Sequence, residues 1–195
     1  MKKKNFIASE HSTSPINIAG GPNSDGANIH FNYPESMLFD LAITSTINGS
    51  VLTASVSQLN EEKAFVAINN ETYELRQLHV HAPSEHTIDN LRHTLEWHFV
   101  HQTEDGHYTV IGVFMEKDNS TTAPYQTLFD VLATSNEGSC TLAPRTLIPE
   151  KTTGWHYNGT LTTPPYDPVQ WVVMQTITTI AESDLQLLLQ AMGQA

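Results

Sequence analysis

Hydrophobic and polar residues alternate along much of this chain, which is the pattern of β-strands that bury one face. Turn-forming Asn, Gly and Asp residues separate the alternating segments. The six segments predicted to be strands are residues 51–59, 64–68, 73–81, 95–101, 108–115 and 170–177. The pattern predicts a mainly β fold, built on a large, mostly antiparallel twisted sheet.

Two segments favour short helices at the margin of this sheet. Pro124 to Ala133 begins with a proline, which the first turn of a helix tolerates. Ser183 to Met192 begins with a serine, which can cap a helix N-terminus. Residues 20–35 are rich in Gly, Pro and Asn, and are predicted to form a loop. Turns are predicted at Asn48-Gly49, Asn69-Asn70, Asp105-Gly106 and Asn158-Gly159.

Length and composition fit a globular protein. We expect residues 1–195 to form a single domain, with a flexible N-terminus over residues 1–12. The net charge of −12 disfavours nucleic-acid binding, because binding to phosphates requires clustered Lys and Arg. The sequence holds no run of about 18 apolar residues, so we expect no membrane span. The single cysteine, Cys140, excludes an intrachain disulfide and a cysteine-based zinc site.

Histidines cluster in one part of the chain. Side chains two residues apart on a strand share a face, so His79 and His81 point the same way. In the next predicted strand, His98 shares a face with Glu96. The residues from Ala82 to Leu95 can return the chain, so the strands can pair as antiparallel neighbours. The six histidines within residues 79–101 are His79, His81, His86, His93, His98 and His101.

This pairing would bring His79, His81 and His98 together. Three neutral imidazoles with an open fourth position are the ligand set of catalytic zinc sites. Zinc-binding histidines also need a polar partner that fixes the ring. Gln77 lies two residues before His79 on the same face, and Glu96 lies two residues before His98. The sequence therefore predicts a Zn²⁺ site.

Other interpretations of these residues stay open at this stage. A single histidine in a strand is more often structural. We assign that role to His86, His93 and His107, and to His101 as a buried, hydrogen-bonded ring. The spacing His79-x-His81-x-x-x-Glu85 also fits the first motif of cupins, in which the glutamate is itself a metal ligand. However, Tyr73 stands where cupins have glycine, and their second motif is not found.

A second motif, GTLTTPPYDPVQW, occupies residues 159–171. It follows the histidine motifs in the order and spacing of one known family. The matching pieces are Ser14-Pro15-Ile16-Asn17-Ile18, Gln77-x-His79-x-His81, Ser84-Glu85-His86-Thr87, Glu96-x-His98-x-Val100-His101, and Tyr157 to Pro165 with Trp171. Together they resemble the α-class carbonic anhydrases, and the short connection between residues 81 and 98 resembles that of the bacterial members.

The resemblance implies an enzyme that hydrates CO2 reversibly to bicarbonate and a proton, a carbonate dehydratase of the lyase class. In this family a zinc-bound hydroxide attacks CO2. A threonine accepts a hydrogen bond from the hydroxide and donates its own proton to a glutamate. The matching residues here are Thr162 and Glu85, and Thr163 would contact bicarbonate.

The resemblance also assigns supporting roles. His86 and Tyr157 would form a hydrogen-bonded network behind the zinc ligands. An apolar pocket would hold CO2, which is an uncharged substrate. The residues that match this pocket are Val100, Val110, Leu161 and Trp171.

The sequence departs from the family in two respects. Ser50 stands where the fastest members carry a histidine that moves protons, so we expect buffer-dependent turnover, because serine does not titrate near pH 7. The family's usual segments before Ser14 and near the C-terminus are not recognised, so the chain is expected to be shortened at both ends. An exposed sheet edge would then favour a homodimer.

Function and location are left with alternatives at this stage. A non-catalytic zinc-binding or interaction module on the same fold is the second hypothesis. The bacterial relatives are usually exported, which implies a periplasmic or secreted protein. However, the apolar run of a signal peptide does not follow Lys2-Lys3-Lys4.

Overall fold

The computed structural model describes residues 13–46, 49–118, 126–135 and 137–194. Three expectations fall outside this part of the chain. They are the flexible N-terminus over residues 1–12, Asn48 of a predicted turn, and Pro124 at the start of a predicted helix.

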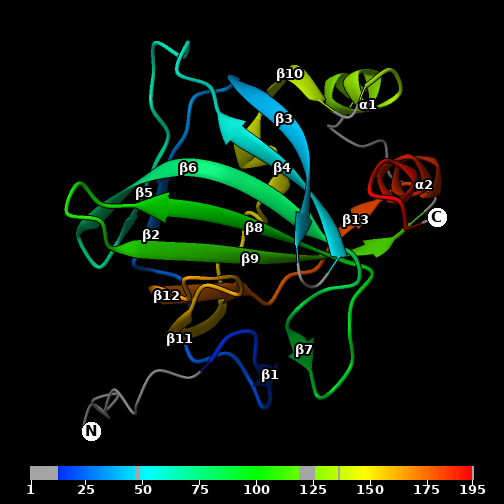
Figure 1. The fold of residues 1–195 in the computed structure, drawn as a ribbon. Helices are drawn as coiled ribbons and strands as arrows, with labels where there is room; N and C mark the ends of the chain where they lie inside the picture. The colour runs from blue at the N-terminus through cyan, green and yellow to red at the C-terminus, as the bar shows by residue number, and fades with distance from the viewer. Residues whose placement is uncertain (1–12, 47–48, 119–125, 136, 195) are drawn as a thin grey trace, which may run out of the picture.

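One large curved sheet dominates the structure, as predicted from the alternating pattern (Figure 1). Its main path runs in the order β10 (Glu137–Leu142), β3 (Met37–Thr46), β4 (Gly49–Val56), β6 (Glu71–His81), β8 (Leu95–Gln102), β9 (Tyr108–Lys117), β12 (Pro168–Met174) and β11 (Gly154–Thr160). Three further strands join this sheet, namely β2 (Ile29–Asn32), β5 (Phe65–Ile68) and β13 (Thr178–Ile180).

Most neighbouring strands are antiparallel, as expected. The exceptions in this sheet are the parallel pairs of β9 with β12 and of β9 with β13. A separate two-stranded sheet pairs β1 (Asn17–Ile18) with β7 (Thr87–Ile88), also in parallel. This small sheet ties the segment that follows Ser14 to the connection between β6 and β8, which carries Glu85 and His86.

All six predicted strands have a counterpart, but several boundaries and loops are corrected. The predicted strand 170–177 is β12, which ends at Met174, because the chain bends at residues 175 and 176 before β13 begins at Thr178. The predicted loop 20–35 contains β2. Asn158-Gly159 is not a turn but lies inside β11, where pairing with β12 overrides the weak strand preference of Asn and Gly. Strands β3 and β10 were not predicted.

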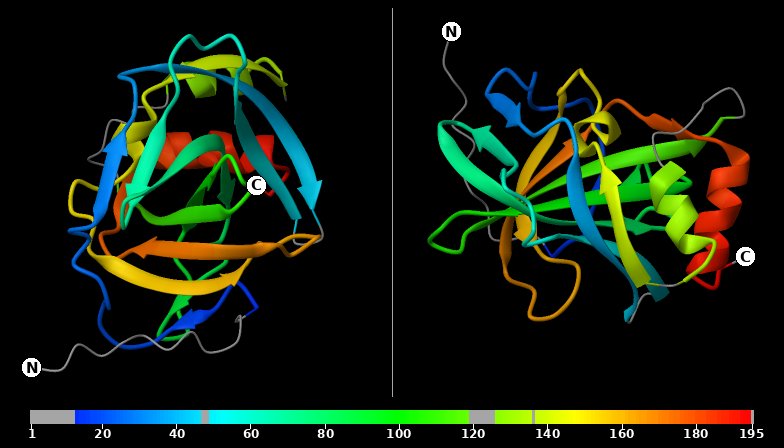
Figure 2. Two further views of the ribbon diagram at one scale, coloured as in Figure 1. Left: turned by 90° about the vertical axis from the view of Figure 1, so that its left-hand side faces the viewer. Right: turned by 90° about the horizontal axis from the view of Figure 1, so that it is seen from above.

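Two short helices lie side by side at one end of the sheet (Figure 2). They are α1 (Gln126–Leu132) and α2 (Glu182–Ala191), within one or two residues of the predicted segments, and a 3-10 turn covers Pro144–Leu147. The predicted cap Ser183 is wrong, because the N-cap position is Ala181, which makes no side-chain capping bond. The apolar face of α2 buries Leu185 and Leu188 against the main core.

Strand β8 is buried on both faces, which explains how a polar cluster comes to lie in the interior. Leu95, Trp97 and Phe99 pack into the main core. On the opposite face Val100 joins a smaller apolar cluster with Trp171. Glu96 and His98 share this second face and are almost completely buried.

A β-bulge lies between β6 and β8. Their register shifts between Leu75 and Gln77, so that β6 has one extra residue against its partner. On one side of the bulge Tyr73 and Leu75 face the main core, and on the other side Leu78 faces it. As a result Gln77 lies on the face that carries the predicted zinc ligands.

His101 is buried and hydrogen-bonded, as predicted. Its Nδ1–H donates to the carbonyl of Phe99 over 2.9 Å, so Nε2 accepts a hydrogen bond from the Tyr33 hydroxyl. Burial lowers the pKa of His101 to about 3, against the raising effect of its backbone hydrogen bonds. The ring is therefore neutral in the folded protein near pH 7.

We predict that His101 makes the free energy of unfolding rise with pH between about 3 and about 6.5. In this window the unfolded chain holds a proton on His101 and the folded chain does not, so stability rises by up to about 1.4 kcal/mol per pH unit. Urea unfolding of the metal-free protein at several pH values measures this slope. It should be smaller in His101→Gln.

His107→Gln is the matched control, because the side chain of His107 is 74% exposed. This variant should keep the slope of the unmodified chain. Equal slopes for His101→Gln and the unmodified chain would contradict the prediction.

Candidate metal centre

The ladder between β6 and β8 builds the histidine cluster. His79 lies directly opposite His98, and His81 lies directly opposite Glu96. This is the antiparallel pairing that the histidine spacing predicts. Because strand neighbours are about 4.8 Å apart, the rings of an opposed pair meet without any change in the backbone.

The three imidazoles converge on one point. The Nδ1 atom of His98 lies 3.2 Å from the Nε2 atom of His79. The ring centroid of His81 lies 5.0 Å from that of His79 and 4.7 Å from that of His98. One nitrogen of each ring lies within 4.8 Å of the other two, which is a spacing that a single metal ion can bridge.

Burial keeps two of these rings neutral. It lowers the pKa of His79 well below its usual value and that of His81 to about 3, and the neighbouring His98 lowers both further. The Nε2 atom of His81 is buried and makes no hydrogen bond within the described part of the chain. An uncharged nitrogen with a free lone pair is the form of histidine that binds a metal.

The donor set fits zinc. Three imidazole nitrogens are the ligand set of known catalytic zinc sites, and imidazole suits Zn²⁺ better than it suits Mg²⁺ or Ca²⁺. The geometry therefore supports His79, His81 and His98 as zinc ligands.

Glu96 supports the third ligand from behind. Its Oε1 atom lies 3.0 Å from the Nε2 atom of His98, on the far side of the ring from His79. Burial alone would lower the pKa of His98, but the Glu96 carboxylate outweighs burial and raises it. The carboxylate thus makes His98 a more basic ligand and fixes which nitrogen faces the cluster.

A chain of hydrogen bonds extends from Glu96 away from the cluster. His86 Nδ1–H donates to Glu96 Oε1 over 2.7 Å, so Nε2 of His86 accepts from the Tyr157 hydroxyl over 2.6 Å. Burial raises the pKa of Tyr157, so the hydroxyl stays protonated. Ser14 Oγ completes the chain 2.9 Å from the Tyr157 oxygen. Ser14 was predicted only as part of a motif, with no role of its own.

Glu85 lies beside the cluster, and Thr162 and Thr163 lie in the turn after β11. The Oε2 atom of Glu85 is 3.3 Å from His81 Nε2 and 3.9 Å from His98 Nδ1. Both threonines are partly buried, and Leu161 N–H closes the turn by donating to the Asp167 carbonyl over 2.9 Å. A hydrogen bond between Thr162 and Glu85 stays a prediction.

The residues expected to hold CO2 gather on the same face of the sheet. Val100, Val110 and Trp171 are buried in one apolar cluster, and Leu161 packs against it. The Trp171 ring lies 4.9 Å from that of His98, centroid to centroid. An apolar surface thus adjoins the polar cluster. Gln77 is partly buried opposite Val100, and its role toward His79 stays a prediction.

Comparison with known proteins identifies the family. A family model described as eukaryotic-type carbonic anhydrase matches residues 2–195. The chain belongs to this family. The motif-based resemblance is therefore confirmed, and the cupin interpretation is set aside.

Three relatives illustrate the carbonic anhydrase match. The chain is 32% identical over 132 residues to alpha carbonic anhydrase 3 of Arabidopsis thaliana. This match covers 65% of this chain and 48% of that protein. It is 30% identical over 166 residues to a carbonic anhydrase of Pectobacterium carotovorum, and the match covers 83% of this chain and 64% of that protein. The solved α-carbonic anhydrase of Photobacterium profundum matches with a TM-score of 0.78 at 29% identity, covering 95% of this chain and 83% of that one.

The chain thus spans less than two thirds of the length of either sequence relative. Among the helices that the structure describes, none has the length and apolar character needed to cross a membrane.

One cavity of about 390 Å³ reaches the histidine cluster of this carbonic anhydrase family member. His81 and Glu85 form part of its wall, so solvent can approach the centre from this side. The residues that line it are Pro15, Ser50, Val51, His81, Ala82, Pro83, Glu85, Arg92 and Gln194.

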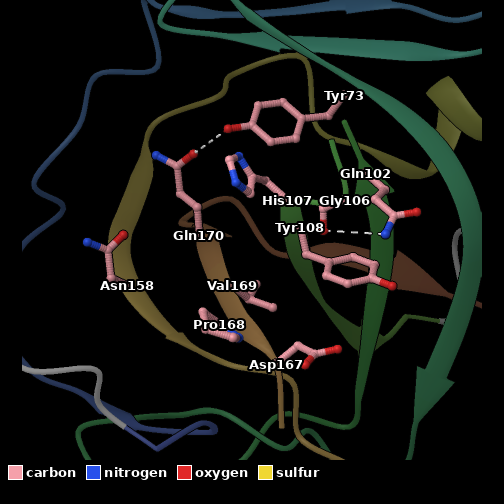
Figure 3. Close-up of a pocket in the computed structure, with 10 residues that line it drawn as sticks. All are labelled: Tyr73, Gln102, Gly106, His107, Tyr108, Asn158, Asp167, Pro168, Val169 and Gln170. Carbon is pink, nitrogen blue, oxygen red and sulfur yellow. Dashed lines mark hydrogen bonds between the residues drawn. The ribbon is translucent and has the colours of Figure 1, made fainter. Parts of the chain in front are cut away.

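A second cavity, of about 620 Å³, lies at the ends of β6, β9 and β12 (Figure 3). Tyr73, Tyr108 and Gln170 are among its walls. It contains none of the residues assigned to the metal centre or to the CO2 pocket. It is therefore a separate feature.

We predict that Glu96→Gln weakens zinc binding roughly 10- to 100-fold, because a neutral amide cannot raise the basicity of His98. Competition with a chromophoric chelator measures the affinity. The matched control is Glu116→Gln. The Oε1 atom of Glu116 lies 2.6 Å from the Nδ1 atom of His93, which is not one of the three clustered histidines. Equal affinities for the two variants would show that Glu96 does not support the site.

Proposed function

We propose that this chain is a zinc-dependent carbonic anhydrase, which hydrates CO2 reversibly to bicarbonate and a proton. The observation that supports this function best is the convergence of His79, His81 and His98 on one point, with a buried carboxylate behind His98. The apolar cluster of Val100 and Trp171 beside it suits CO2. Membership of the family supports the same function.

The three histidines would hold the zinc ion. When bound, zinc lowers the pKa of a water molecule to about 7, as is known for carbonic anhydrases. The protein's part is to present neutral nitrogens at His79 and His81 and a more basic nitrogen at His98. Because all three rings stand on paired strands, they are held in place before the metal arrives.

Glu85 and Thr162 would aim the attacking oxygen. The proposed arrangement has the Thr162 hydroxyl accept a hydrogen bond from that oxygen and donate its own proton to the Glu85 carboxylate. Glu85 lies beside His81, which is a suitable place for this role. Thr163, next in the same turn, would contact bicarbonate.

The proton released by the reaction must leave the site. Ser50 lines the cavity that reaches His81 and Glu85, so it stands on a route to solvent. A serine cannot carry a proton at neutral pH, because its hydroxyl does not titrate in that range. Transfer to buffer molecules would then limit turnover.

The test of this function is CO2 hydration by the purified, zinc-loaded chain, followed by stopped-flow with a pH indicator. We expect activity that depends on zinc and that His98→Ala abolishes. Glu85→Gln should bind zinc normally and turn over at least about tenfold more slowly, because it loses an orienting acceptor and not a ligand.

Each contrary result has a defined meaning. A folded, zinc-loaded chain without activity would favour the non-catalytic zinc-binding module. Loss of zinc from Glu85→Gln would instead make Glu85 a metal ligand and overturn its proposed role.

We predict that Ser50→His raises the CO2 hydration rate in weak buffer, because an imidazole with a pKa near 6.5 can accept and release protons at neutral pH. The gain should shrink as the buffer concentration rises. Initial rates over a buffer series measure both effects. Ser50→Gln, which has a similar size but does not titrate, should give no gain, and an equal gain from both variants would contradict the prediction.

A further inference from the structure

Gly112 is an unusual residue for its place in the sheet. It lies in the middle of β9, directly opposite His98, in a segment that is otherwise rich in Val, Ile and Phe. Glycine inside a strand weakens it, and often marks a place where another group comes close. Here that group is the Glu96 carboxylate.

A side chain at position 112 would collide with one particular atom. A Cβ there would lie 2.9 Å from Glu96 Oε1, which is closer than such contacts allow. The nearest other atoms are the two methyl groups of Val173, at the ordinary contact distances of 3.6 and 3.7 Å. A methyl group at 112 could therefore be accommodated only if the carboxylate moved.

The carboxylate is not free to move. Glu96 is completely buried, so it cannot swing into solvent. Its Oε2 atom accepts hydrogen bonds from the backbone N–H groups of Glu85 and His86, each over 2.9 Å. Its Oε1 atom, the one that a Cβ would strike, is the atom that meets the rings of both His86 and His98.

We propose that Gly112 is a positioning residue for the metal centre. The missing side chain creates the space in which Glu96 Oε1 holds the ring of His98. This inference rests on the proposed function, because it acts on zinc through His98. Alanine at 112 would push Oε1 away from the Nε2 atom of His98, which loosens the orientation of that ring.

The test is a cycle of four proteins, namely the unmodified chain, Gly112→Ala, Glu96→Asp and the double variant. Gly112→Ala should weaken zinc binding roughly tenfold or more, by chelator competition. Aspartate is shorter, so its carboxylate no longer fills the space beside residue 112. In the Glu96→Asp background, Gly112→Ala should therefore reduce zinc affinity less than about threefold. Such non-additivity would show that residues 112 and 96 are in direct contact.

A second measurement reports geometry and not affinity. The visible spectrum of the cobalt-substituted protein depends on the arrangement of its ligands. It should change in Gly112→Ala and remain unchanged in Gly21→Ala, where an added Cβ meets no atom within 4 Å. Shortening the other neighbour, in Gly112→Ala with Val173→Ala, should not restore zinc affinity.

The outcomes separate this inference from the proposed function. An unmodified chain that binds no zinc overturns the proposed function itself. If the unmodified chain binds zinc, two results overturn the role of Gly112 alone. One is an equal loss of zinc affinity from Gly112→Ala in both backgrounds, and the other is no loss of zinc affinity in either. If Gly112→Ala does not fold, recovery of folding in the double variant supports the inference, and a double variant that also fails to fold overturns it.

Discussion

The pairing of β6 with β8 is the constraint on which the centre depends. The side chains of a strand alternate between its two faces, so a slip of one residue would turn His98 away from His79 and bury it in the main core. The register is fixed from both sides, because β4 pairs with β6 and β9 pairs with β8. The ligand geometry is thus a property of the sheet and not of a loop that must close around the metal.

The same register buries a carboxylate, which is costly unless every contact is satisfied. Glu96 meets this requirement through two backbone N–H groups and two imidazole rings. Burial alone would raise its pKa, but His86 and His98 hold the pKa well below its usual value. A charge fixed in the interior acts on His98 with little screening by water, so its effect on the ring is larger than that of a surface carboxylate.

Much of this centre could be predicted from the sequence, because it depends on local periodicity. His79 and His81 share a face by strand geometry alone, and Glu96 and His98 do so for the same reason. The network behind them could not be derived in that way. Ser14 and Tyr157 are far apart in the chain and meet only through the complete fold. Strand β11 was also missed, since its Gly and Asn residues favour turns locally and only pairing with β12 makes them a strand.

The bulge in β6 has a further consequence. Tyr73 and Leu75 face the main core before it, and Leu78 and Val80 face that core after it, so the inward side changes from odd to even positions within one strand. A regular strand could not both bury Tyr73 and Leu75 and point His79 and His81 away from that core. The extra residue near Arg76 changes which face of β6 the odd-numbered side chains occupy, so both requirements are met. One strand can therefore serve a hydrophobic interior at one end and a metal centre at the other.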